Sequence, residues 1–393
     1  MSIKGKAAIV GYGETEFLKR NPGDRSNYTE YCRAAKLAIE DAGLTKDDID
    51  GLISIYPLDE EPTWTEDLQE YLQLHPRFLD NVYRGGASGN AAILYGAAAL
   101  AGGLCNNILI VAGSVMDPRR IYEFGLETGT AFERDFDSIY GPMFNNSAYA
   151  MIKRRYMHEF NATDDQFAHV VINARYHASK FPNALLKKQV TVEDVLDSRL
   201  ICDPLHLFEI VMPCVGGCAL VMTSAERAKD TKNPPVYLLG GGQQFDRGLW
   251  NPAYGYERSL TTSPVKLAAK YAFEMSELGI KDMDFVELYD CYTITVVISL
   301  EDIGCCEKGE GAVYVEETDL SYKGDMPLNT DGGQLGRGQP NPGIHLMHSI
   351  EAARQLMGRA GELQVEEAAF GLSNGNGGSM ADQCTLIFGN EIP

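Results

Sequence analysis

A glycine-rich turn before a long apolar helix is the stretch of this chain whose residue types most clearly suit chemistry. The segment Asn81-Val-Tyr-Arg-Gly-Gly-Ala-Ser-Gly-Asn90 leads from a predicted strand into a helix predicted from Ser88 to Leu104. The first turn of a helix presents unpaired backbone N–H groups and a partial positive charge, so it could hold an oxyanion or an activated nucleophile. The turn itself contains no Cys and no His. A reactive side chain would therefore have to come from another segment.

The charge balance limits the class of ligand. The 393 residues include 34 Lys and Arg against 55 Asp and Glu, which gives a formal net charge of −21. This acidity argues against binding to nucleic acid or to an anionic membrane surface. Local basic pairs could still meet a phosphorylated small molecule, or could simply face solvent. These pairs are Arg154 with Arg155 and Lys187 with Lys188.

The cysteines and the N-terminal residues indicate the compartment. The nine cysteines show no paired CxxC spacing, so we expect neither a metal site nor a disulfide framework. The chain enters a strand-like segment directly after Met1, without the apolar region of a signal peptide, and contains no run of eighteen apolar residues. We therefore expect a soluble cytoplasmic protein.

An internal repeat predicts the fold class. Ala34-Ala-Lys-Leu-Ala-Ile-Glu40 is matched by Ala268-Ala-Lys-Tyr-Ala-Phe-Glu274, and each is followed by a glycine, an acidic turn and an apolar run. In both copies a helix leads to a strand, and a glycine-rich turn with a second helix comes later. This order predicts an α/β fold with two βαβ-rich halves, which we place at residues 1–235 and 236–393.

A long excursion separates the two copies. Residues 119–227 are too many for a simple connection in a compact repeat, so we expect them to have a functional role. Helical patterns occur at Ala148–Met157 and from Thr163 to Lys180, where Thr163 is a suitable N-cap. Ligands of open α/β sheets bind at the carboxyl ends of the strands, which is where the glycine turns are expected.

Five stretches, in order along the chain, carry a resemblance to a known family. They are Tyr149–Met157, Thr191–Leu205, Thr223–Ala228, Glu287–Tyr292 and Asn329–Gly333. Together they resemble the thiolase superfamily, in the branch of the sterol carrier protein x type thiolases. The resemblance implies a duplicated, five-layered α/β/α/β/α thiolase fold, a homodimer, and an excursion that covers the acyl-CoA pocket.

The chain departs from the thiolase pattern at three positions that such enzymes need for Claisen chemistry. Gly86 stands where the resemblance places the nucleophilic Cys. Gln339, in Gly338-Gln-Pro340, replaces the His of a Gly-His-Pro motif, and Ser373 lies near the position of a second reactive Cys. A covalent acyl-enzyme at residue 86 is therefore not expected, because the thiolate that would form it is missing.

The segment Glu287-Leu-Tyr-Asp-Cys-Tyr292 offers a different chemistry. Tyr289 stands where sterol carrier type enzymes have a His, while Asp290 and Cys291 match their motif. A tyrosine hydroxyl can exchange a proton with an alcohol if a polar pocket lowers its pKa. The pattern is similar to thiolase-like aldolases that shorten steroid side chains. It implies retro-aldol cleavage of a bulky β-hydroxyacyl-CoA with Tyr289 as the acid/base.

Further site residues follow from the same comparison. A thioester enolate needs hydrogen-bond donors. The glycine turn, the Gly338-Gln-Pro340 segment and the C-terminal loop supply the candidates: Gly86, Ser88, Gln339, Ser373, Asn374, Asn376, Gly377 and Gly378. His345 and His348 are candidates for a second proton carrier, or for structural residues on the helix after Pro342.

Two other functions stay open. Cys291 could act as a nucleophile or base, which would make the protein an unusual thiolase or acyltransferase. The chain could also be a non-catalytic scaffold subunit, since relatives without catalytic residues can serve as structural partners.

The resemblance also suggests ligands and partners. Arg154, Arg155, Lys187 and Lys188 are candidates for contacts with coenzyme A, which enters as part of the substrate; no other cofactor is expected. Relatives of this branch work with a small zinc-ribbon and OB-fold subunit, so we expect a homodimer joined to that partner in a heterotetramer. An aromatic excursion suits a bulky acyl group: Tyr122, Phe124, Phe132, Phe136, Tyr140 and Phe144.

Overall fold

One mixed sheet runs through the whole fold. The computed structural model describes residues 2–56, 64–115, 141, 144–246, 259–340 and 346–393. Nine strands are hydrogen-bonded in the order β3-β2-β4-β7-β1-β8-β11-β10-β9. Their bounds are β1 Ala7–Glu14, β2 Gly51–Ile55, β3 Phe78–Val82, β4 Asn107–Ser114, β7 Gly216–Ser224, β8 Val236–Phe245, β9 Phe285–Leu288, β10 Phe370–Gly377 and β11 Asp382–Gly389.

The strand order confirms the predicted duplication. In the first half β2-β4-β7-β1 are neighbours, and in the second half β9-β10-β11-β8 are neighbours in the matching order. The pairing types also match, because β2 with β4 and β9 with β10 are parallel, while β4 with β7 and β10 with β11 are antiparallel. The two halves meet where β1 pairs with β8, and β8 begins at Val236, where we placed the start of the second half.

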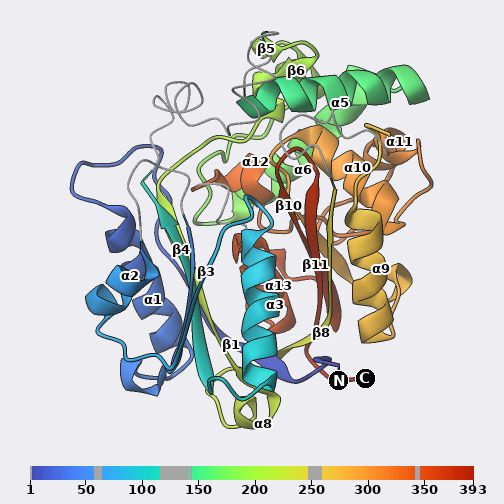
Figure 1. Cartoon of the computed structure of the whole chain (residues 1–393). Helices are drawn as coiled ribbons and strands as arrows, with labels where there is room; N and C mark the ends of the chain where they lie inside the picture. The colour runs from blue at the N-terminus through green and yellow to red at the C-terminus, as the bar shows by residue number, and fades with distance from the viewer. Residues whose placement is uncertain (1, 57–63, 116–140, 142–143, 247–258, 341–345) are drawn as a thin grey trace.

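The helices complete five layers, as Figure 1 shows. Helices α1 and α2 cover one outer face, α3 and α13 lie between the two halves of the sheet, and α9 and α10 cover the other outer face. The bounds are α1 Asn27–Asp41, α2 Thr65–Leu72, α3 Ser88–Ala101, α9 Val265–Ser276, α10 Thr293–Ile303 and α13 Leu346–Leu356. The expected α/β/α/β/α arrangement is therefore present.

The excursion forms a cap of helices and a small strand pair over the strand ends. Figure 1 places α5 above the sheet, together with the small β5 and β6 pair. The bounds of these elements and of the remaining α-helices are α5 Phe144–Phe160, α6 Asp164–Lys180, α7 Val192–Leu196, β5 Leu200–Cys202, β6 Leu205–His206, α8 Ala225–Ala228, α11 Gly311–Glu317 and α12 Gly333–Arg337. Thr163 is the N-cap of α6, as predicted. No helix within the described ranges is long and apolar enough to cross a membrane.

One boundary of the excursion was predicted wrongly. We assigned residues 119–227 to it, but β7 lies inside the sheet between β4 and β1. Its residues are buried and pair with both neighbouring strands. The excursion therefore ends before Gly216, because a strand buried on both faces and flanked on both edges belongs to the core.

Paired glycines let the outer helices approach the sheet closely. A Cβ at Gly240 or Gly242 of β8 would overlap the backbone carbonyls of Ala272 and Ala268 in α9. In the first half, Gly11 and Gly13 of β1 face α1 with the same spacing. The repeat therefore includes a packing requirement as well as an order of elements, since only glycine lacks the atom that would clash.

This packing gives a test of the fold. Replacing Gly242 by Ala should lower the free energy of unfolding by about 1–3 kcal/mol, because the added methyl group forces α9 away from β8. Urea denaturation measures the change. Gly279→Ala is the control, because its added methyl group would meet only the Asp282 side chain at 3.7 Å. An equal loss in both variants would contradict the packing argument.

Candidate active site

The glycine turn and Tyr289 meet at the start of α3. Tyr289 follows β9, and its backbone N–H donates to the carbonyl of Asn374 at 3.0 Å. A Cβ placed on Gly86 would overlap the Tyr289 ring and the backbone carbonyl of Asn376. The ring therefore occupies the space that any side chain at residue 86 would need. The structure brings together two residues that were predicted separately, Gly86 and Tyr289.

The Tyr289 hydroxyl is held by a pair of glutamines. The Gln339 side-chain amide donates to the Tyr289 oxygen at 2.7 Å and to Oε1 of Gln334 at 3.0 Å. Backbone hydrogen bonds to Met212 and from Cys214 fix Gln339 itself. Because Gln339 is the donor, the phenol proton of Tyr289 points away from Gln339. The residue that replaces the expected His thus positions the tyrosine instead of supplying a base.

Burial changes the proton affinity of this tyrosine. Desolvation raises the pKa of Tyr289 well above its ordinary value, and the nearby Cys291 and Asp290 act in the same direction. The hydrogen bond from Gln339 opposes this effect but does not overcome it. The pocket therefore does not lower the pKa of Tyr289, because loss of water disfavours the phenolate more than one amide donor stabilises it. Tyr289 is a neutral phenol at neutral pH.

Asp290 anchors the short helix that carries Gln334. Its carboxylate accepts hydrogen bonds from the backbone N–H groups of Gln334 at 2.8 Å and Leu335 at 3.1 Å, in the first turn of α12. A carboxylate at a helix start satisfies N–H groups that lack a partner inside the helix. Asp290 therefore acts through α12, Gln334 and Gln339 on the position of Tyr289.

His348 lies behind Asp290, in a buried cluster of charges. Its ring nitrogens are 3.4 Å from Oε2 of Glu287 and 3.3 Å from Oδ1 of Asp290. Burial lowers its pKa, but the two carboxylates outweigh this and raise the pKa to about 9. For Glu287 burial acts in the other direction and raises the pKa of the carboxyl group to about 8. His348 is therefore a buried cation that supports Asp290. His345, the other predicted histidine, lies outside the described residues.

Two arginines extend this cluster through the core. Arg337 pairs with Glu14 and Asp331, and Arg354 pairs with Glu14 and Glu351. Thr330 joins the cluster to the site, because its backbone N–H donates to Glu287 and its hydroxyl donates to Glu351. Buried charges require such partners, and removing one member leaves another uncompensated.

Cys291 is a buried thiol beside Tyr149. The environment raises its pKa, mainly through desolvation, while hydrogen bonds with Tyr149 and Thr295 have a smaller opposing effect. Reactive cysteines have lowered pKa values and partial exposure, whereas only 6 % of Cys291 is exposed. These properties do not favour Cys291 as a covalent nucleophile.

The predicted residues of the C-terminal loop face different ways. The Ser373 hydroxyl contacts Ser349 and Asn90 in the middle helix layer. Asn374 and Asn376, on the other face of β10, are both joined to Gln383 of β11. Successive strand residues alternate between faces, which accounts for the separation.

The turn residues around Gly86 shape the backbone. The Ser88 hydroxyl donates to the carbonyl of Gly85 and accepts from the backbone N–H of Arg84, both at 2.7 Å. Gly85 has a φ of +54°, a conformation that favours glycine. At the other side of the turn, Gly377 and Gly378 lie against Gly85. Ser88 therefore stabilises the turn and is not directed at a ligand.

The four predicted basic residues lie at the surface with local partners. Arg154 pairs with Asp203, and Arg155 pairs with Glu159. Lys187 donates to the carbonyl of Pro182, and Lys188 lies 3.9 Å from Asp194. Their contact with coenzyme A stays a prediction.

Sequence reasoning missed two residues of the site, Gln334 and Tyr149. Gln334 lies next to Gly332 and Gly333, in the glycine-rich stretch that the sequence marked as a turn. Tyr149 belongs to a stretch that carried the family resemblance, but nothing in the sequence placed its hydroxyl near residue 378. In the structure that hydroxyl donates to the carbonyl of Gly378 at 2.7 Å.

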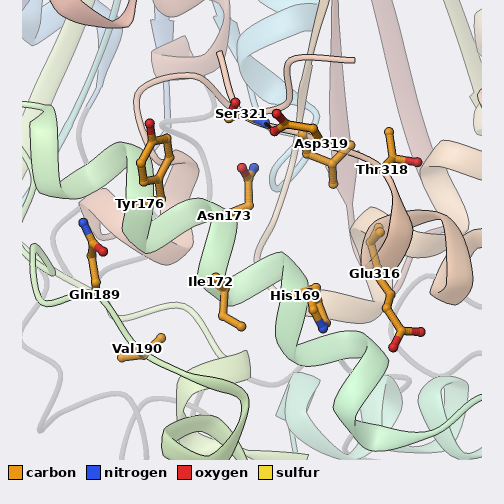
Figure 2. A pocket seen from close by; sticks show the side chains of 12 residues that line it. His169, Ile172, Asn173, Tyr176, Gln189, Val190, Glu316, Thr318, Asp319 and Ser321 are labelled. Carbon is orange, nitrogen blue, oxygen red and sulfur yellow. Dashed lines mark hydrogen bonds between the residues drawn. The ribbon is translucent and has the colours of Figure 1, made fainter. Parts of the chain in front are cut away.

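A separate cavity of about 430 Å³ opens between α6 and the segment after α11. Figure 2 shows side chains from both segments around it, among them Asn173 and Tyr176 on one side and Asp319 and Ser321 on the other. None of the predicted site residues lines this cavity.

The charge on His348 makes stability depend on pH. Its folded pKa of about 9 exceeds the ordinary value of 6.5, so the folded protein retains a proton that the unfolded chain releases. This stabilisation is complete below about pH 6.5 and is lost as the pH rises through about 9. Urea denaturation should show the free energy of unfolding falling by up to about 3 kcal/mol over this window.

The variant His348→Gln isolates this effect. Glutamine does not titrate, so the free energy of unfolding should fall less steeply with rising pH in this variant. Some fall should remain, because the raised pKa of Glu287 also makes the folded protein less stable as the pH rises. His169→Gln, on the half-buried surface of α6, is the matched control and should keep the wild-type slope. Equal slopes in the wild type and His348→Gln would show that His348 is not the titrating group.

Comparison with known proteins gives relatives along nearly the whole chain. A steroid side-chain-cleaving aldolase of Thermomonospora curvata is 33% identical over 90% of this chain and 91% of its own length. A 17-hydroxy-3-oxo-4-pregnene-20-carboxyl-CoA lyase of Mycobacterium tuberculosis is 32% identical over 91% and 92%. An acetyl-CoA acetyltransferase of Methanothermobacter thermautotrophicus is 31% identical over 97% and 98%.

The family model and the solved structures agree with these relatives. Residues 247–390 match the model described as Thiolase C-terminal domain-like. The structure of the Ltp2-ChsH2(DUF35) aldolase has a TM-score of 0.87 and 29% identity, and covers 98% of both chains. A monomeric SCP2-thiolase like protein of Mycobacterium smegmatis shares the fold, with a TM-score of 0.74. The chain belongs to the thiolase superfamily, in the branch that contains SCP2-thiolase-like proteins and steroid side-chain-cleaving aldolases.

Proposed function

We propose that this chain cleaves a bulky β-hydroxyacyl-CoA, of the steroid side-chain type, into a shorter acyl-CoA and a ketone or aldehyde. The contact between Tyr289 and Gly86 carries the proposal, because the tyrosine ring occupies the space that a nucleophile at residue 86 would need. A retro-aldol step requires no covalent acyl-enzyme. The aldolase and lyase relatives support the substrate class.

The reaction transfers one proton at the hydroxyl and breaks one bond. The Tyr289 oxygen, as the phenolate, takes the proton of the β-hydroxyl group, the Cα–Cβ bond breaks, and its electron pair forms the thioester enolate. The raised pKa makes the phenolate scarce but strongly basic, which suits removal of a proton from an alcohol. In the condensation direction the neutral phenol donates its proton to the carbonyl oxygen.

The enolate requires donors near the glycine loops. We propose the backbone at Gly377 and Gly378 for this role, since Gly377 and Gly378 adjoin the turn that contains Gly86. Gln339 serves mainly to hold Tyr289, because its amide already donates to Tyr289 and Gln334.

The proposal includes coenzyme A contacts and a partner. We propose that the exposed basic pairs of the excursion contact the phosphate groups of the coenzyme A part of the substrate. These pairs are Arg154 with Arg155 and Lys187 with Lys188. A homodimer joined to a small zinc-ribbon and OB-fold subunit is the proposed assembly. The similar Ltp2-ChsH2(DUF35) aldolase structure supports a partner of this kind.

Loss of the Tyr289 hydroxyl tests the function directly. Tyr289→Phe should lower turnover of a β-hydroxyacyl-CoA by about 10²–10⁴-fold, the range for an acid/base group. The free energy of unfolding should fall by about 1–3 kcal/mol, because one N–H of the buried Gln339 amide loses its acceptor while the other keeps its hydrogen bond to Gln334. The measurement is release of ketone or aldehyde from a panel of β-hydroxyacyl-CoA thioesters.

A tyrosine outside the site provides the control. Tyr237→Phe, at the start of β8, should keep turnover within about twofold, as expected for a change far from the chemistry. Near-normal turnover in Tyr289→Phe would remove Tyr289 from the mechanism.

An acyltransferase acting through Cys291 is the second candidate, since one relative is an acetyl-CoA acetyltransferase. Under our proposal Cys291→Ser should reduce turnover by less than about tenfold, because serine keeps a small polar group beside Tyr149 and no thioester bond forms on this residue. Iodoacetamide treatment of the wild type gives an independent measurement. Complete loss of turnover in the folded serine variant would favour covalent catalysis.

A further inference from the structure

A second buried tyrosine lies beside Tyr289 and reaches the site from a different element. Tyr149 comes from α5 in the cap, and only 2 % of it is exposed, compared with 4 % of Tyr289. The electrostatic surroundings of the Tyr149 hydroxyl include Cys291 and Tyr289. Two hydroxyl groups, from the cap and from the strand end, therefore lie in one water-poor region.

A chain of amides fixes the donor and acceptor roles around Tyr149. Thr385 donates to Asn374, Asn374 donates to Gln383, and Gln383 donates to Asn376, with distances of 2.7 to 2.9 Å. The Asn376 carbonyl oxygen is therefore occupied, and its amide group donates to the Tyr149 oxygen at 3.1 Å. Because Asn376 is the donor in this contact, the Tyr149 hydroxyl keeps its own proton for another acceptor. Its other hydrogen-bond neighbours are the carbonyl of Gly378 and the thiol of Cys291.

That proton lies at the glycine loop. The Tyr149 hydroxyl donates to the carbonyl oxygen of Gly378 at 2.7 Å, next to the turn that contains Gly86. The Tyr149 ring stacks on Tyr292, with 4.1 Å between the ring centroids, and this contact holds it in place. The Tyr292 hydroxyl in turn donates a hydrogen bond to Oδ1 of Asn146 at 2.6 Å. Rotation about one C–O bond redirects the proton without moving the ring.

We propose that Tyr149 is the second proton-transfer residue of the site and delivers a proton to Cα of the thioester enolate. The role rests on the proposed function. Tyr289 receives the proton of the β-hydroxyl group, the Cα–Cβ electron pair becomes the enolate, and a new C–H bond forms at Cα as the O–H bond of Tyr149 breaks. After the products leave, the proton on Tyr289 returns to Tyr149 through water, so the cycle is balanced.

The environment of Tyr149 suits an acid. Burial, together with the neighbouring Cys291 and Tyr289, raises its pKa well above the ordinary value, so it is protonated at neutral pH. Asn376 stabilises the phenolate that forms after proton transfer, because its amide already points at the oxygen. Exclusion of water makes a protein donor necessary, since bulk water cannot easily reach the enolate.

Exchange of the α-hydrogens of propionyl-CoA with D₂O, followed by proton NMR, isolates this step from cleavage. The wild type should exchange them, and Tyr149→Phe should slow exchange by about 10²-fold or more while keeping the wild-type unfolding curve. Tyr289→Phe should lose cleavage of β-hydroxyacyl-CoA thioesters yet keep exchange. Tyr156→Phe is the matched control, because it removes another buried hydroxyl of α5 that is bonded to Glu301 outside the site.

The outcomes separate the two claims. A wild type that releases no ketone or aldehyde from the thioester panel overturns the proposed function. Exchange that survives Tyr149→Phe, or that is absent from the wild type, overturns the role of Tyr149. Loss of exchange in Cys291→Ser with survival in Tyr149→Phe overturns it as well, and assigns the proton to the thiol.

Discussion

The close approach of the Tyr289 ring to the backbone of Gly86 is the constraint on which the site depends. A side chain at residue 86 and a tyrosine at residue 289 cannot share this space. A thiolase nucleophile and this tyrosine are therefore mutually exclusive in the observed arrangement. The fold keeps the helix start of a thiolase, while the group beside it has changed from a potential nucleophile to a phenol.

The buried charges behind the site explain how a tyrosine at a strand end is held rigidly. His348, which pairs with Glu287, supports Asp290, and Asp290 holds the start of α12. Gln334 of α12 accepts from Gln339, and Gln339 donates to the Tyr289 hydroxyl. Positioning residues of this kind matter because proton transfer requires hydrogen-bond distance and alignment. The middle helix layer thus serves both as the core between the two halves of the sheet and as the support of the site.

The sequence allowed prediction of the duplicated fold, because helix, turn and strand recur in the same order in both halves. The family resemblance also identified Gly86, Gln339 and Tyr289. It could not place Tyr149, because its contact with Gly378 joins residues 229 positions apart. The direction of the Tyr289 pKa shift could not be predicted, because it depends on burial, which only the fold reveals and which outweighs the hydrogen bond from Gln339. β7 was missed because no matching segment marked it as a core strand.

The requirement for free coenzyme A tests the central claim most directly. Retro-aldol cleavage uses no thiol acceptor, whereas a thiolase must transfer its acyl group to coenzyme A. We predict that ketone or aldehyde release from a β-hydroxyacyl-CoA proceeds at the same rate with and without added coenzyme A. Strict dependence on added coenzyme A, with formation of a second acyl-CoA, would contradict the account.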